Sequence, residues 1–110
     1  MDSIDSMDEK NALTDEHKAS LQQIFSVLSK SDDPDFIANF FQCLFTPSEL
    51  KDMATRWLLV QKLDAGISQR QISRELHISL CRITRGSKEL KKDSSAFRQL
   101  LDKIKNEGLQ

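Results

Sequence analysis

Arginine and lysine side chains gather in one stretch of this 110-residue chain, between Gly66 and Lys92. Seven cations stand there against two acids, a net charge of +5, although the whole chain carries a formal net charge of -1. Guanidinium and ammonium groups bind phosphates, and guanidinium groups also pair with carboxylates and stack on aromatic rings. The stretch therefore predicts a surface for an anionic partner, with nucleic acid as the first candidate.

The remaining residues that could do chemistry form no recognisable site. Cys43 and Cys81 lack CxxC spacing, and His17 and His77 have no second ligand at metal-binding spacing. The two cysteines are expected to be small apolar fillers in a reducing cytoplasm. No Ser, Asp or Glu forms a nucleophile and base arrangement, so we expect neither a metal site nor an enzyme.

Two short helices with a tight corner are expected to carry the basic stretch. The first, over 68–76, opens with a capping box of Ser68 and Gln71. His77 occupies the corner, where the backbone must turn left-handed and glycine is the usual residue. The second helix, over 80–90, follows directly. Such a pair matches a helix-turn-helix, held by Ile72 and Leu76 against Ile78 and Ile83.

In a helix-turn-helix, the start of the second helix reaches base edges in the major groove, and basic residues around it meet phosphates. The residues expected to contact DNA are Gln69, Arg70, Ser73, Ser79, Leu80, Cys81, Arg82, Thr84 and Lys91. Two amphipathic helices with a solvated basic face, forming a protein-interaction module for an acidic partner, are an alternative.

Four further helices are predicted from start signals and apolar spacing. Thr14 caps the first of them, and Asp33 with Pro34 opens a second whose four phenylalanines are too many to leave in water. The third runs from Thr46, with Pro47 and Glu49 completing its start, and stops at Gly66. It is apolar on more than one face, as expected of the spine of a dimer.

The last helix begins at Ser94 or Ser95 and ends before Gly108. The fold class is therefore all-α, with six helices and no strand. Residues 1–13 are polar and acidic and are expected to be a flexible arm, and 14–110 a single domain with its helix-turn-helix at 68–91. No apolar run is long enough for a membrane span, and the acidic start excludes a signal peptide.

Three motifs resemble one family. "FTPSELKDMATRW", "GISQRQISREL" and "ITRGSKELK" occur in this order and spacing, with a threonine-arginine pair nine residues after Thr46. They resemble the Trp repressor family over about residues 14 to 105. The resemblance implies an intertwined homodimer with two helix-turn-helix reading heads. It also implies L-tryptophan as a corepressor bound between core and head, a palindromic operator on double-stranded DNA, and control of tryptophan biosynthesis or uptake genes.

The same resemblance implies seven ligand-binding residues: Cys43, Phe45, Thr46, Arg56, Arg85, Gly86 and Glu89. Arg56 and Arg85 would sandwich the indole ring, and Arg85, helped by the Thr46 hydroxyl, would hold the carboxylate. The ammonium would lie near the carbonyls of Cys43 and Phe45, at a helix end that favours a cation.

Gly86, which has no Cβ, would let the ring approach closely. Glu89 departs from the family, which has a small hydroxyl residue there, and this puts the ligand selectivity in doubt. Arg82 replaces a smaller polar residue, so the operator sequence need not be shared.

Three alternatives remain for these residues. Arg56 could only pair with Asp52 or Glu49 on its own helix, and Trp57 is expected in the core and not in a binding platform. The chain could also be a ligand-independent helix-turn-helix protein related to transposase modules.

Overall fold

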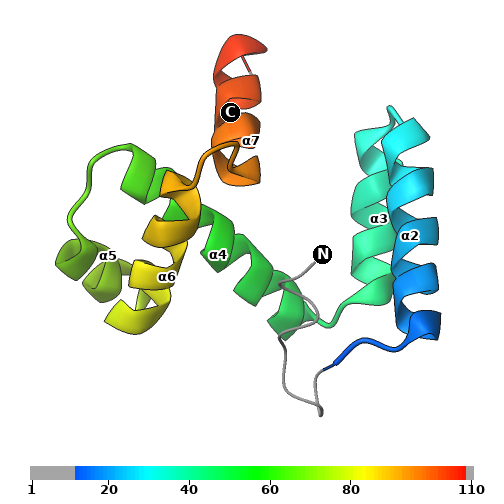
Figure 1. The fold of residues 1–110 in the computed structure, drawn as a ribbon, viewed down its shortest axis with the longest axis horizontal. Helices are drawn as coiled ribbons and strands as arrows, with labels where there is room; N and C mark the ends of the chain where they lie inside the picture. Colours follow the sequence, from blue (N-terminus) through cyan, green and yellow to red (C-terminus); the bar gives the residue numbers. More distant parts are fainter. Residues whose placement is uncertain (1–11, 109–110) are drawn as a thin grey trace. The chain divides into compact units, whose positions relative to one another are not determined.

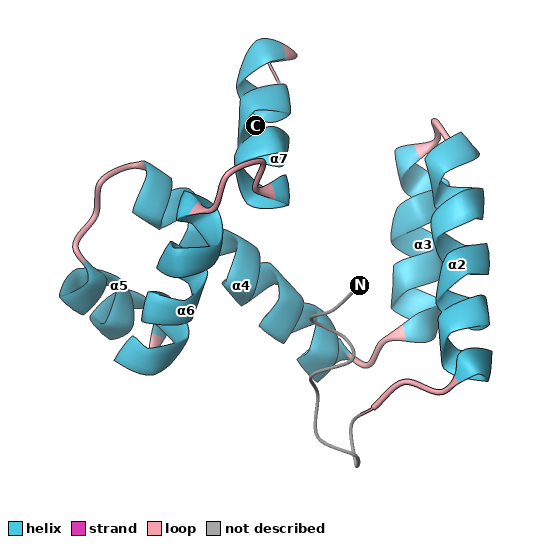
Figure 2. Ribbon diagram, in the orientation of Figure 1, coloured by secondary structure: helices cyan, strands magenta, loops and turns pink. Residues whose placement is uncertain are grey.

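A computed structural model describes residues 12–108 of the chain, so the predicted acidic arm lies almost entirely outside the described residues. Over the described range the chain is helical, with no strand, which confirms the all-α class (Figure 2). The helices are α2 (Asp15–Lys30), α3 (Pro34–Leu44), α4 (Pro47–Asp64), α5 (Gln69–Leu76), α6 (Leu80–Lys91) and α7 (Ala96–Asn106) (Figure 1). None of them is long and apolar enough to cross a membrane.

The chain divides into two compact units, one ending at Leu44 and one beginning at Phe45. In the first, α2 and α3 lie side by side, while the second contains α4 to α7 (Figure 1). We refer to them as the α2–α3 unit and the α4–α7 unit.

The predicted helix starts are confirmed. Thr46 caps α4, because its hydroxyl accepts from the Glu49 amide at 3.1 Å while the Glu49 carboxylate accepts from the Thr46 amide at 2.8 Å. Thr14 and Ser95 cap α2 and α7. The carboxylate of Asp33 accepts from the Asp35 amide at 3.0 Å at the start of α3. These caps depend on neighbours three residues away or fewer, so the sequence alone specifies them.

The corner between α5 and α6 has the predicted left-handed backbone at His77, with φ 55° and ψ 45°. Ser73 fixes the corner from α5, because its hydroxyl donates to the Ile78 carbonyl at 2.7 Å. Ser79 then caps α6 by accepting from the Arg82 amide at 3.2 Å. The corner is therefore held by local hydrogen bonds on both sides.

Half of the capping box predicted for α5 is wrong. The Ser68 hydroxyl accepts from the Gln71 amide at 3.2 Å, as expected. The Gln71 side chain does not turn back to Ser68, and donates instead to the Glu75 carboxylate at 2.9 Å. A partner one turn ahead on the same helix face competes successfully with the backbone.

The core of the α4–α7 unit lies where α4 meets α5 and α6. Leu59 of α4, Ile72 of α5 and Ile83 of α6 are buried together. Partly buried apolar side chains surround these three: Leu63, Ile67, Leu76 and Ile78. The predicted packing of Ile72 and Leu76 against Ile78 and Ile83 is thus confirmed, with α4 as the surface on which the helix-turn-helix rests.

Ion pairs join the C-terminal end of α4 to α7. Asp64 receives Arg98 and Lys105 of α7, each at 2.8 Å, and its side chain is only 14% exposed. These two cations lower the pKa of Asp64 by hydrogen bonding, Lys105 most strongly. Trp57 lies beside Phe97 with ring centroids 6.2 Å apart. Trp57 thus packs against α7 but is only half-buried, so it is not part of the buried core in which it was expected.

The α2–α3 unit is different, because neither of its helices contains a buried residue. Phe25 and Phe36 are 56% and 46% exposed. The expectation that the α3 phenylalanines are shielded from water is therefore wrong for Phe36 within this single chain. In α4 only Leu59 and Val60 are buried, while Leu58 is exposed. The prediction that α4 is buried on several sides is therefore also wrong within this single chain.

Candidate functional site

A cavity of about 230 Å³ opens between α4, α6 and the start of α7, and we call it the α4–α6 cavity. Four of the seven predicted ligand residues line it: Arg56, Arg85, Gly86 and Glu89. Arg56 comes from α4 and the other three from α6, so residues 29 to 33 positions apart meet at one opening. The remaining lining residues are Thr55, Leu59, Val60, Ile78, Arg82 and Phe97.

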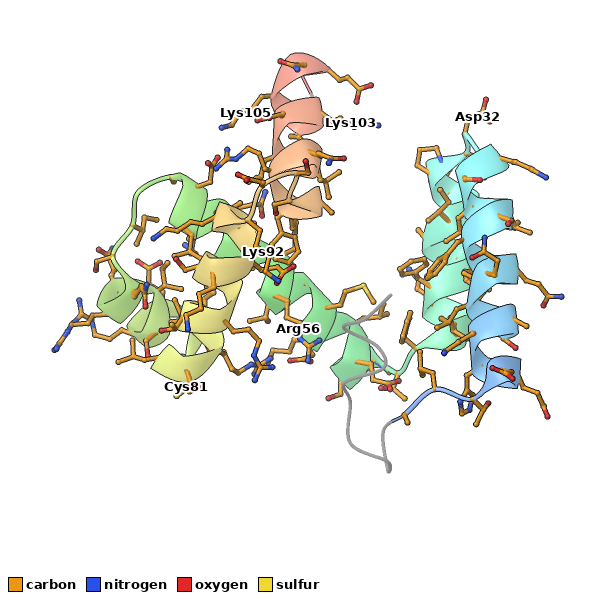
Figure 3. The ribbon with its side chains drawn as sticks, in the orientation of Figure 1. Asp32, Arg56, Cys81, Lys92, Lys103 and Lys105 are labelled. Carbon is orange, nitrogen blue, oxygen red and sulfur yellow. The ribbon has the colours of Figure 1, made fainter. Side chains whose placement is uncertain are left out.

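The guanidinium groups of Arg56 and Arg85 have different surroundings. Arg56 lies 3.1 Å from a carboxylate oxygen of Asp52 on its own helix, and its side chain is 70% exposed (Figure 3). This is the pairing that the alternative reading foresaw, although Arg56 lines the cavity as well. Within residues 12–108, Arg85 makes no ion pair and no side-chain hydrogen bond. Arg85 can therefore accept a carboxylate without breaking an existing contact.

The interior of the cavity is apolar. Leu59 and Val60 form the α4 wall, and Phe97 adds an aromatic ring from α7. Gly86 has a specific role in this packing, because a Cβ there would meet the Leu59 Cδ2 at 3.1 Å. The missing Cβ thus lets α6 approach α4 itself, which adds a helix-packing reason to the ring approach expected at this position. An apolar space with a cation at its edge suits a flat ring that carries a carboxylate.

Glu89 lies on the same cavity wall, one turn beyond Arg85. Its carboxylate pairs with Lys92 at 2.9 Å, and both side chains are largely exposed. An ion pair of this exposure is weak, so a ligand ammonium could replace the lysine at small cost.

The other three predicted ligand residues are not among those that line the cavity. Thr46 is occupied as the cap of α4, where its oxygen accepts a hydrogen bond and its proton stays available to a ligand. Phe45 lies just before this cap and is partly buried. Cys43 is an exposed free thiol in the last turn of α3, in the α2–α3 unit. Roles for these three remain predictions.

Arg82 lies on the cavity side of α6, although the sequence pointed it toward DNA. Its guanidinium donates to the Asp52 carboxylate of α4 at 2.9 Å. This hydrogen bond is the main reason that the pKa of Asp52 is lowered. Helical spacing could have revealed the position, because Arg82, Arg85 and Glu89 stand at i, i+3 and i+7, on one face of α6. The same signal on α4 joins Arg56 to the missed residues Leu59 and Val60.

A second, more open groove of about 580 Å³ runs along the adjoining face of α6 and shares Arg85 and Glu89 with the cavity. Three predicted DNA-contacting residues line it: Leu80, Cys81 and Thr84. Cys81, at the start of α6, is exposed and carries a free thiol (Figure 3). Lys88 and Lys92 add positive charge, which gives this face the cationic character expected of a phosphate-binding surface.

Several of the predicted DNA contacts also bind within the protein. Thr84 donates to the Gln69 side chain at 3.2 Å, which joins α6 to α5. Ser73 and Ser79 hold the corner and the cap described above. Arg70 and Lys91 are exposed. The structure therefore brings the predicted residues onto one helix-turn-helix but leaves their contacts with DNA as predictions.

Over the described part of the chain, no group of His, Cys, Asp and Glu side chains could hold a metal ion. The chemistry that the α4–α6 cavity offers is noncovalent. It consists of an apolar space, a free guanidinium and a carboxylate within two turns of one helix. Such a set can bind and orient a small zwitterion.

Comparison with known proteins agrees with these features. Residues 19–105 match the family described as Trp repressor protein. A Trp operon repressor homolog of Vibrio parahaemolyticus is 38% identical over 85 residues, which cover 76% of this chain and 80% of that protein. One from Vibrio campbellii is 34% identical over 90 residues (81% and 90%), and one from Chlamydia trachomatis serovar L2 is 28% identical over 92 residues (83% and 98%).

No solved structure matches the chain significantly. The family match spans the helix-turn-helix and the α4–α6 cavity together. The chain belongs to the Trp repressor family of DNA-binding transcriptional regulators.

Proposed function

We propose that this repressor uses L-tryptophan as its corepressor, bound in the α4–α6 cavity. The observation that carries the proposal is the position of Arg56 and Arg85, which line one apolar cavity from two different helices. The indole ring lies between their guanidinium planes, and Arg85 holds the carboxylate. The cavity, at about 230 Å³, is below the range of about 300–1,000 Å³ that is typical for drug-sized ligands, and this supports a ligand as small as one amino acid.

The roles of the polar groups follow the resemblance to the family, and the cavity lining supports those of Arg85 and Glu89. Arg85, with no partner among the described residues, is the carboxylate site, and the Thr46 hydroxyl assists it. Glu89 attracts the ammonium in competition with Lys92. Gly86 keeps the opening clear of a side chain. Charge complementarity at both ends selects an α-amino acid over an indole without these groups.

The repressor acts as a homodimer in this proposal. The exposed apolar side chains Phe25, Phe36, Leu44, Met53 and Leu58 supply surface for a second copy. The dimer presents two helix-turn-helix heads to a palindromic operator, with recognition helices about 34 Å apart, one turn of DNA. Contacts to DNA come from Gln69, Arg70, Ser73, Ser79, Leu80, Cys81, Thr84 and Lys91, whereas Arg82 is paired with Asp52.

Ligand and operator favour the same arrangement of the heads. Tryptophan fixes α6 relative to α4 by contacting both helices, and the operator selects the same spacing. By linkage, each then tightens binding of the other. The regulated genes in this proposal are those of tryptophan biosynthesis or uptake, and the repressor works in the cytoplasm.

The test is a gel-shift assay on a pool of palindromic DNA, with and without L-tryptophan, for the wild type and for Arg85→Ala. Lys91→Ala is the matched control for the tryptophan effect. It removes a cation from the same helix outside the cavity, so it should lower overall retention as a lost DNA contact and leave the response to tryptophan unchanged. We expect tryptophan to strengthen retention of the wild type and of Lys91→Ala, and to have little effect on Arg85→Ala. Retention that ignores tryptophan in all three proteins would contradict corepression and favour the ligand-independent reading.

A further inference from the structure

One carboxylate joins two of the three arginines that border the α4–α6 cavity. Asp52, in the second turn of α4, accepts from Arg82 at 2.9 Å through one oxygen and lies 3.1 Å from Arg56 through the other. Arg82 is in the first turn of α6, 30 residues further along the chain. Asp52 therefore connects the start of the recognition helix to the helix on which it rests.

This contact divides the arginines of α6 between two tasks. Arg85 has no ion pair within residues 12–108, whereas Arg82, one turn before it, is engaged by Asp52. A guanidinium that is paired with a carboxylate of its own chain is less available to base edges, because the contact must first be broken, at a modest cost for two half-exposed groups. Arg82 thus helps to hold α6 against α4, and it must leave Asp52 before it can contact DNA.

The contact is made of protein groups alone. A second tie of the same kind lies nearer the C-terminal end of α4, where Lys62 pairs with Glu75 of α5 at 2.8 Å. The apolar cluster of Leu59, Ile72 and Ile83 lies in the same interface. Two ion pairs therefore hold the helix-turn-helix to α4 in addition to the buried apolar contacts, and neither ion pair requires a ligand.

We propose that Asp52 and Arg82 are positioning residues that hold the start of α6 against α4, so that part of the orientation of the reading head does not depend on the corepressor. The proposal rests on tryptophan-dependent repression as described above. Its consequence is that this repressor binds its operator measurably without tryptophan. Loss of the Asp52 carboxylate should make the protein depend more strongly on the ligand.

Asp52→Asn is the direct variant, because it keeps the shape of the side chain and removes the charge. Half-exposed ion pairs are modest, so we expect the α6 amides to exchange hydrogen about two- to fivefold faster in the variant, measured without tryptophan or DNA. The α7 amides should exchange as in the wild type, because α7 is tied to α4 through Asp64 instead. Asp52→Glu, which keeps the carboxylate, should restore most of the protection.

Retention of operator DNA in a gel-shift assay is the second measurement. Without tryptophan, Asp52→Asn should weaken retention about two- to fivefold, and saturating tryptophan should remove most of this difference. Asp93→Asn is the matched control, since it removes the same charge from the loop after α6, where Asp93 is exposed. Loss of an anion by itself tightens binding to DNA, so a pure charge effect would strengthen retention in both variants.

The positioning role of Asp52 and Arg82 is overturned if α6 exchange is unchanged in Asp52→Asn, or if Asp52→Asn and Asp93→Asn tighten retention alike. Because the exchange experiment contains neither tryptophan nor DNA, its failure leaves corepression standing. A wild type that ignores tryptophan, while α6 exchange rises as expected in Asp52→Asn, would overturn the proposed function and leave the positioning role of Asp52 and Arg82 in place.

Discussion

The α4–α7 unit and the α2–α3 unit are both built from capped, amphipathic helices, yet only one of them has a core. Leu59, Val60, Ile72, Ile83 and Leu101 are buried in the first, whereas α2 and α3 contain no buried residue. The difference teaches that local signals make a helix but that burial needs further helices across the apolar face. In the α2–α3 unit, that face must be covered from outside the unit to stay out of water.

The largest expected effect concerns the core of the α4–α7 unit. Ile72→Ala removes a side chain that is 0% exposed, and should lower the free energy of unfolding by about 2–5 kcal/mol. Urea unfolding followed by circular dichroism measures it. Leu80→Ala, at a leucine that is 46% exposed, should cost far less. Equal losses at the two positions would mean that burial does not set the stability of this unit.

The next effect concerns the uncovered face of the α2–α3 unit. If a second copy covers it, Phe36→Ser should weaken dimerisation by about 2 kcal/mol, roughly 30-fold, as aromatic interface residues do. Sedimentation velocity over a range of concentrations measures the dissociation constant. Leu80→Ser is the control, because both residues are 46% exposed in this chain. A wild type that sediments as a monomer, or equal weakening by both variants, would contradict the assignment.

The smallest effect concerns Asp64, which ties α7 to α4. Its pKa in the folded protein is held below the ordinary value of 3.8, so its stabilising contribution is complete above about pH 4 and is lost as the pH falls through the folded value. Asp64→Asn should cost about 1 kcal/mol at pH 7 and progressively less below pH 4. Melting temperatures at pH 7 and pH 3 check this. If Asp64→Asn lost as much stability at pH 3 as at pH 7, the ion pairs of Asp64 could not be the cause of the loss.

Features that depend on near neighbours in the chain could be predicted from the sequence. The cap at Thr46 and the left-handed corner at His77 follow from residue types within three positions. The resemblance to the family also placed Arg56, Arg85 and Glu89 together, and they line one cavity.

Features that depend on distant partners could not be predicted in this way. The contact between Asp52 and Arg82 joins residues 30 positions apart, and the residue spacing within either helix does not indicate the partner on the other. A local choice can also stay open, since Gln71 had two partners within four residues and only the geometry of α5 decides for Glu75. Sequence patterns assign a side chain to a helix face, but tertiary packing decides which other helix that face contacts.

Calorimetric titration of L-tryptophan is the most direct test of the central claim, that Arg56 and Arg85 hold the ligand across the α4–α6 cavity. We expect one binding event per chain for the wild type and for Lys91→Ala, and binding weakened at least tenfold by Arg85→Ala, because a carboxylate would lose its charged partner. Arg56→Ala should weaken binding less, since it removes stacking alone. Absence of heat in the wild type, or equal affinity in the wild type and Arg85→Ala, would contradict the account.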